Sequence, residues 1–270
     1  MVTSRKRRAI SSRGVRLQPR DVFVLEQAVR FHAFTVPLLR ETLYHGLGRS
    51  TVYESIRRLV RAGLFEDLTT GPSNRLRPGD VPALYVPTPL AYALLGSPLR
   101  ARPVRPELAR HTLAVAQVGL RAVLAHEAVV TDREMHFERQ QWRNSRQTRT
   151  PLAAAWMGND EDFWIPGLPA WESVSPDLDT HVPDLVITGH DGEVHAIEVE
   201  LSRKNTRELT MVLKRYGRTR KYDAVIYYAE TKTMAERIKK VTEALPPADR
   251  PPTLVIRRLV PEWQERRKAA

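Results

Sequence analysis

The chain has 270 residues, with 43 Lys or Arg against 31 Asp or Glu, so its formal net charge at pH 7 is +12. Hydrophobic residues make up 42% of the sequence and charged residues 27%, which is typical of a globular protein and argues against a disordered chain. Because there is no cysteine, disulfide bonds and thiolate metal sites are excluded. The positive charge favours a polyanionic partner, either a nucleic acid or an acidic membrane surface.

The sequence contains neither an apolar run long enough to span a bilayer nor a hydrophobic leader, and we therefore expect a cytoplasmic protein with no membrane partner. Residues 1–20 are basic, and no acidic residue precedes Asp21. We interpret this segment as a mobile basic arm that follows DNA phosphates or a minor groove. The alternative is a solvated tail with no specific role.

Three consecutive helices are predicted after the arm, because apolar residues recur at helical spacing in 21–32, 35–44 and 50–61. Thr35 is placed to cap the second helix, and the hydroxyl of Ser50 is placed to cap the third. The pattern therefore indicates a small helical domain at the start of the globular part of the chain.

A hairpin follows the helices, with strands at 65–68 and 83–86 on either side of a polar stretch at 70–80. This order of elements resembles a winged helix-turn-helix domain, and we assign residues 21–99 to it. Most of the resemblance is carried by the third helix, from Ser50 to Leu64, which starts with small polar residues and ends at a glycine.

The resemblance implies that the third helix reads the major groove while the hairpin contacts the flanking DNA backbone. The alternative is a winged helix that contacts protein, or a plain three-helix core. The residues expected to contact DNA are Arg49, Ser50, Thr51, Tyr53, Arg57 and Arg58 on the third helix and Arg75 and Arg77 at the tip of the wing.

Residues 100–127 are expected to form a basic, proline-rich linker followed by an amphipathic helix at 107–126. This helix is the candidate for pairing two copies of the chain in a homodimer, and the alternative is that it packs within its own chain. Residues 143–179 hold three tryptophans without clear periodicity, and we expect an irregular insertion there.

From His181 onward the pattern changes to strands and helices in alternation. A strand at 184–188 and a strictly alternating strand at 194–201 flank a tight turn, and two further helix–strand pairs follow. This order predicts a mixed sheet with helices on its faces. The whole chain is therefore expected to be of the α+β class, with a second, α/β domain at 128–262.

The second domain resembles the PD-(D/E)xK nuclease-like superfamily, through Pro183-Asp184 and Glu198-Val199-Glu200 on the next strand. The resemblance implies that Asp184 and Glu198 bind a divalent metal such as Mg²⁺, which lowers the pKa of bound water and stabilises charge on a phosphate. Glu200 occupies the position where the superfamily usually has a catalytic lysine, and Lys204 is the alternative source of a cation.

Two alternatives to an active metal site stay open for this second domain. One is a strand whose two glutamates lie on a solvated or salt-bridged face, and the other is a degenerate nuclease fold kept for DNA binding or assembly. Asp184, Glu198, Glu200 and Lys204 are accordingly candidate catalytic residues. Mg²⁺ is expected as a cofactor only if the site is active, and nucleotide cofactors are not expected because the chain has neither a P-loop nor a GxGxxG motif.

The complete layout is similar to the replication-relaxation family of plasmid and integrative-element proteins. The segments that carry this resemblance are Tyr85 to Thr88, His111 to Val115, Pro183 to Val186 and Ile197 to Leu201. It implies a protein that binds double-stranded DNA in plasmid replication, mobilisation or transcriptional control. The alternatives are a Mg²⁺-dependent endonuclease targeted by its winged helix, and a scaffold that binds an acidic protein.

Overall fold

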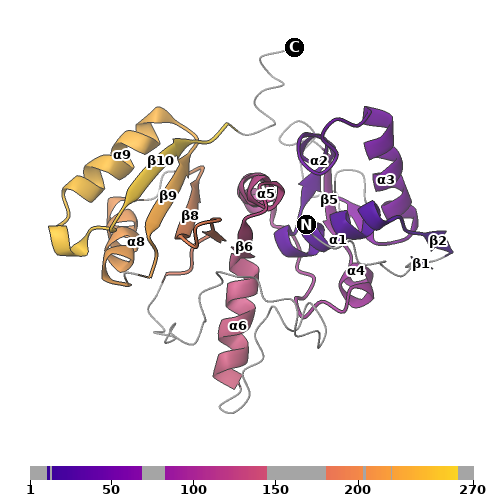
Figure 1. Cartoon of the computed structure of the whole chain (residues 1–270), viewed down its shortest axis with the longest axis horizontal. Helices are drawn as coiled ribbons and strands as arrows, with labels where there is room; N and C mark the ends of the chain where they lie inside the picture. The colour runs from indigo at the N-terminus through magenta and orange to yellow at the C-terminus, as the bar shows by residue number, and fades with distance from the viewer. Residues whose placement is uncertain are drawn as a thin grey trace. The chain divides into compact units, whose positions relative to one another are not determined.

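The computed structural model describes residues 11–12, 14–68, 83–144, 181–202, 205–219 and 221–260. The chain divides into two units, Met1–Ala116 and Gln117–Ala270, and the division falls inside helix α5 (Figure 1). Four of the sequence predictions lie wholly or largely outside the described residues: the first half of the basic arm, Arg75 and Arg77 at the wing tip, the insertion at 143–179, and Lys204.

The first unit has the predicted three helices, α1 (Pro19–Phe31), α2 (Val36–Glu41) and α3 (Arg49–Arg61). The two predicted strands are also present, as β4 (Phe65–Asp67) and β5 (Leu84–Pro87). They pair antiparallel and are joined by a strand that the sequence did not predict, β3 (Phe34–Thr35), in the order β3-β5-β4. Two shorter strands, β1 (Ser11–Ser12) and β2 (Val15–Arg16), lie inside the segment expected to be a mobile arm, and helix α4 (Pro89–Leu94) follows β5.

Two helix caps were predicted from the sequence, one for α2 and one for α3, and the structure agrees with the first only. The predicted cap of α2 is confirmed, because Oγ1 of Thr35 accepts a hydrogen bond of 3.1 Å from the backbone N–H of Leu38. The predicted cap of α3 is wrong. That helix starts at Arg49 with Gly48 as its N-cap residue, so Ser50 already lies in the first turn.

The second unit is built on a five-stranded mixed sheet in the order β10-β9-β8-β7-β6, as predicted for its type. The strands β8 (Val194–Glu200), β9 (Ala224–Ala229) and β10 (Leu254–Arg258) run parallel. Strand β7 (Leu185–Thr188) pairs antiparallel with β8, and β6 (Ala128–Thr131) pairs antiparallel with β7 at the edge of the sheet. Strand β6 and the helix that follows it, α6 (Asp132–Asn144), were not predicted.

Helices α8 (Thr206–Thr219) and α9 (Lys232–Glu243) share one core with the parallel strands (Figure 1). This core holds Leu213 and Tyr216 of α8, Ile238 of α9, and Ala196 and Tyr227 of the sheet, among others. A short helix, η3 (Pro247–Asp249), lies against α8 so closely that a Cβ atom at Gly217 would come within 2.2 Å of the carbonyl oxygen of Asp249. Glycine is therefore required where these two backbones meet.

The predicted amphipathic helix at 107–126 is present as a short helix, η1 (Pro106–Leu108), followed by α5 (Ala109–Leu124). Its apolar side chains are largely buried within the chain, including Leu113, Ala114, Val118, Leu120 and Ala122, whereas Leu108 and Leu124 are exposed. None of the helices in the described part of the chain is long and apolar enough to cross a membrane.

Candidate functional site

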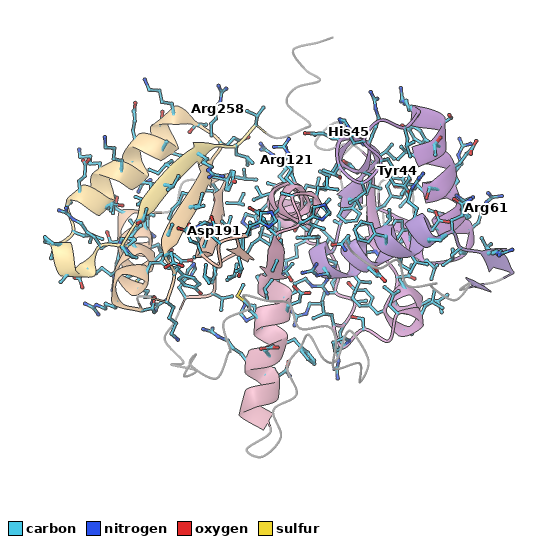
Figure 2. All side chains as sticks on the ribbon, in the orientation of Figure 1. Tyr44, His45, Arg61, Arg121, Asp191 and Arg258 are labelled. Carbon is cyan, nitrogen blue, oxygen red and sulfur yellow. The ribbon has the colours of Figure 1, made fainter. Side chains whose placement is uncertain are left out.

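The outer side of α3 carries a row of side chains that we call the α3 strip: Arg49, Tyr53, Arg57 and Arg61. Each is four residues from the next, so the four lie along one side of the helix. The opposite side of α3 packs into the core through Val52, Ser55, Ile56 and Leu59, which turns the strip outward. Figure 2 shows Arg61 projecting away from the other helices of this unit.

The arginines of the α3 strip are exposed, and within the described residues none of the three forms an ion pair with a carboxylate. Arg49 is held by its neighbour on the strip. One of its terminal nitrogens donates a 3.2 Å hydrogen bond to the Tyr53 hydroxyl, and its guanidinium lies 5.3 Å from the centre of the Tyr53 ring. This contact limits the rotamers of Arg49 and presents its charge in one place.

Tyr85, on β5, lies next to the α3 strip and was not among the predicted site residues. Its side chain is half-buried. Burial raises the pKa of Tyr85, the charge of Asp67 and the hydroxyl of Tyr53 raise it further, and the charge of Arg57 lowers it. Tyr85 is thus within electrostatic reach of both α3 residues. The end of β5 is also bound to the turn after α3, where the hydroxyl of Thr88 donates a 2.6 Å hydrogen bond to the carbonyl oxygen of Gly63. In the sequence, Tyr85 could be recognised only as a residue of a predicted strand. That position did not show that the strand lies near α3.

Arg58, also predicted to contact DNA, is instead bound within the domain. Its Nε donates a 2.8 Å hydrogen bond to Oδ2 of Asp21, a carboxylate that is only 1% exposed. Oδ1 of Asp21 accepts a hydrogen bond from the Ser55 hydroxyl, which in turn accepts one from the hydroxyl of Tyr44 (labelled in Figure 2). Asp21 thus joins α1 to α3 and to the turn after α2. Ser50 is exposed and Thr51 is half-buried on the same helix.

The second candidate site is the group of three carboxylates Asp184, Glu198 and Glu200, which we call the carboxylate cluster. Glu198 is 2% exposed and Glu200 is 6% exposed, so the prediction of a solvated face is wrong. The other half of that alternative, a face with paired charges, is not contradicted, since Nε2 of His181 lies 2.7 Å from Oε1 of Glu198. The register of β7 with β8, in which Leu185 opposes Ile197, puts Asp184 opposite Glu198. Oδ2 of Asp184 accepts a 2.7 Å hydrogen bond from the backbone N–H of Val199.

Glu198 is bound by two side chains that the sequence reasoning missed. Its Oε1 accepts a hydrogen bond from the hydroxyl of Tyr216 on α8, and Nε2 of His181 lies 2.7 Å from the same oxygen. The rings of His181 and Tyr216 meet edge-on, with their centres 5.6 Å apart. Nothing in the sequence separated Tyr216 from the apolar residues of its helix, because it occupies a core position.

Two further tyrosines enclose this site. Tyr227, on β9, is opposite Glu198 in the parallel register and is fully buried. Burial raises its pKa well above the usual value, as do the charges of Glu198, Glu200 and Asp184, so all three carboxylates of the cluster lie around it. Burial also raises the pKa of Tyr222 to about 12, against the opposing charge of Arg139.

Oxygen ligands of this kind suit Mg²⁺, but the arrangement fits a bound metal only in part. Within the described residues, no group of three or more His, Asp or Glu side chains is placed to hold a metal ion. One oxygen of Glu198 is already engaged by Tyr216 and His181. Glu198 is thus hydrogen-bonded inside the sheet and helix layer, whereas Oε2 of Glu200 and the hydroxyl of Tyr227 are buried and make no hydrogen bond among the described residues.

Comparison of the chain with family models, curated proteins and solved structures gave no match. The resemblances to winged helix-turn-helix, nuclease-like and replication-relaxation proteins therefore rest on the sequence motifs described above.

Asp21→Asn should destabilise the first unit by about 2–4 kcal/mol, because it removes one charge of a buried ion pair and replaces one of two acceptor oxygens by an NH2 group that faces a donor. Urea unfolding of the full chain, with amide hydrogen exchange read in α1 and α3, measures the loss. The matched control is Glu54→Gln, which removes an exposed carboxylate from α3 and should change stability by less than about 0.5 kcal/mol. Equal effects of the two substitutions would contradict the assigned role of Asp21.

Tyr222 should make the protein less stable in alkali. Its pKa is about 12 in the folded chain and 10.0 as a model value, so the folded state favours the neutral phenol. This stabilisation is complete below pH 10 and is lost as the pH rises through 12, a change of about 2–3 kcal/mol. Urea unfolding across this range should show a steeper loss for the wild type than for Tyr222→Phe. Parallel curves for the two proteins would mean that the phenol is not held neutral by the fold.

Proposed function

We propose that the chain is a cytoplasmic DNA-binding protein acting in the replication, mobilisation or transcriptional control of a plasmid or integrative element. In this proposal the first unit is a winged helix-turn-helix domain, α3 is its recognition helix, and β4 and β5 form the base of the wing. The observation that carries the proposal is the α3 strip, whose three arginines are exposed and have no carboxylate partner in the described residues.

Unpaired arginines on one side of a helix are suited to DNA. Guanidinium groups bind phosphate oxygens and the major-groove edge of guanine through paired hydrogen bonds. Each phosphate contact releases condensed counterions, which supplies much of the binding free energy at moderate salt. The contact between Arg49 and Tyr53 adds to this by orienting one of these guanidinium groups before DNA arrives.

In this proposal the second unit has a nuclease-like fold that takes part in binding DNA and does not cleave it. Glu198, the residue expected to ligate a metal, is held by Tyr216 and His181 instead. Because the apolar side chains of α5 are mostly buried within the chain, the proposal assigns no dimer interface to that helix.

Arg57→Ala should weaken binding to duplex DNA and lower the slope of log affinity against log salt by about 1, since one phosphate contact is lost. The measurement is fluorescence anisotropy of a labelled duplex at several salt concentrations. Arg215→Ala is the matched control, because it removes an exposed arginine from α8 in the other unit and leaves the net charge equally reduced. If both variants lose the same affinity, binding follows overall charge and the recognition-helix assignment is wrong.

A second candidate, a Mg²⁺-dependent endonuclease, is favoured by the gathering of three carboxylates around Tyr227. In that case Asp184 and Glu198 would hold the metal, which would supply an activated water and stabilise charge on the phosphate. Glu200 would then have to serve in place of the lysine, since it lies two residues after Glu198 on β8.

Supercoiled plasmid distinguishes the two candidates. The first predicts retarded migration without cleavage, unchanged by EDTA, and the second predicts nicking in Mg²⁺ or Mn²⁺ that disappears in Glu198→Gln. Glu236→Gln, an exposed glutamate on α9, is the control and should nick like the wild type if nicking occurs. Nicking that persists in Glu198→Gln would point to a contaminant and would remove the support for the endonuclease.

A further inference from the structure

We propose that Tyr85 extends the α3 strip onto the sheet and donates a hydrogen bond from its hydroxyl to a backbone phosphate of duplex DNA. This inference rests on the proposed DNA-binding function and adds a contact residue that belongs to the sheet, not to the recognition helix. It makes α3 and β5 two parts of one DNA-contact surface.

The position of Tyr85 is fixed by its strand. β5 is the central strand of its sheet, and Tyr85 is opposite Phe34 of β3 on one side and Asp67 of β4 on the other. Side chains stand roughly perpendicular to a sheet and are flanked by their cross-strand neighbours. The ring of Tyr85 is therefore supported on both sides, and its hydroxyl is the end that can reach a ligand.

The hydroxyl of Tyr85 is available for a new partner. Among the residues that the structure describes, none forms a hydrogen bond with it, and the side chain is only half-buried. A hydroxyl in this situation binds water in the free protein and can exchange that water for a phosphate oxygen at little cost. The two tyrosines of this surface, Tyr53 and Tyr85, would then differ in role, because the Tyr53 hydroxyl already accepts from Arg49.

The charges around Tyr85 favour an anion on one side of it. Arg57 is close enough to lower its pKa, and Asp67 is close enough to raise it. A phosphate is attracted to the side of Arg57 and repelled from the side of Asp67, so the DNA backbone would run along the junction of α3 and β5. A phenol is protonated at neutral pH, and burial raises the pKa of Tyr85 further, so the hydroxyl is in the form that donates to a phosphate.

The test is Tyr85→Phe in the full chain, with affinity for a fixed duplex measured by fluorescence anisotropy over a range of salt. A hydrogen bond to a charged acceptor predicts about tenfold weaker binding. The salt slope should stay unchanged, since no charge is removed, whereas Arg57→Ala should reduce it by about 1. Together the two substitutions should cost less than the sum of their separate effects, because both groups bind one phosphate.

Tyr228→Phe is the matched control, because Tyr228 is a half-buried strand tyrosine of the second unit whose hydroxyl accepts from Arg257. It should bind DNA like the wild type. Tyr85→Lys places a positive charge at the same position. It should bind duplex DNA more tightly than Tyr85→Phe, and its slope of log affinity against log salt should be steeper by about 1. The thermal midpoint of each variant shows that the fold is retained.

The outcomes separate this inference from the proposed function. If Tyr85→Phe binds as tightly as the wild type while Arg57→Ala binds weakly, the phosphate contact of Tyr85 is overturned and the recognition helix stands. A larger loss with single-stranded DNA than with duplex would also overturn it, since the substitution removes only the hydroxyl and that result would place the hydroxyl on an unpaired strand and not on the duplex backbone. A wild-type chain that shows no affinity for duplex would refute the proposed function itself.

Discussion

The buried carboxylate of Asp21 is the interaction on which the first unit depends. An ionised group that is almost completely removed from water costs free energy unless hydrogen bonds and a counter-charge offset the lost hydration. Asp21 receives both, from Arg58 and Ser55 of α3 and from the backbone N–H of Gln18, at 2.9 Å. Since two of these donors are on α3, the carboxylate determines the rotation of that helix about its own axis. This contact acts together with the buried side of α3, and the α3 strip faces outward as a consequence of both.

A buried carboxylate has a different effect in the second unit. Glu198 lies on the central strand β8, with Tyr216 of α8 and His181 of the segment before β7 bound to the same oxygen. These donors compensate for burial and at the same time occupy a position that a metal ligand would need. The hydrogen bonds that make the carboxylate compatible with the core are thus the same ones that engage this oxygen. In the proposed function, this engaged oxygen is the reason for favouring DNA binding over cleavage.

Periodicity in the sequence was sufficient for most of the elements, because helices α1, α3 and α8 and strands β7 to β9 each bury a regular apolar face. It was not sufficient for β3 and β6, which have two and four residues and carry too little pattern to be recognised alone. The carboxylate cluster was predicted from residue types, since Asp184 and Glu198 stand on paired strands. Its tyrosines and His181 were missed because their roles come from contacts between segments far apart in the chain.

The positions of the charged side chains say more about where a polyanion could bind than the net charge of the chain does. On α8, Lys214 and Arg218 both reach the carboxylate of Asp249, at 3.4 and 3.1 Å, so part of the positive charge there is already neutralised. On α3, the adjacent residues Arg57 and Arg58 differ in their partners, because Arg58 binds Asp21 and Arg57 remains exposed. A polyanion gains most where arginines are fixed in position but not paired, because neither an ion pair nor much side-chain freedom is lost on binding. Arg49 on α3 meets this condition through its contact with Tyr53. Under the proposed function, a substitution there should affect DNA binding more than one elsewhere that removes the same charge.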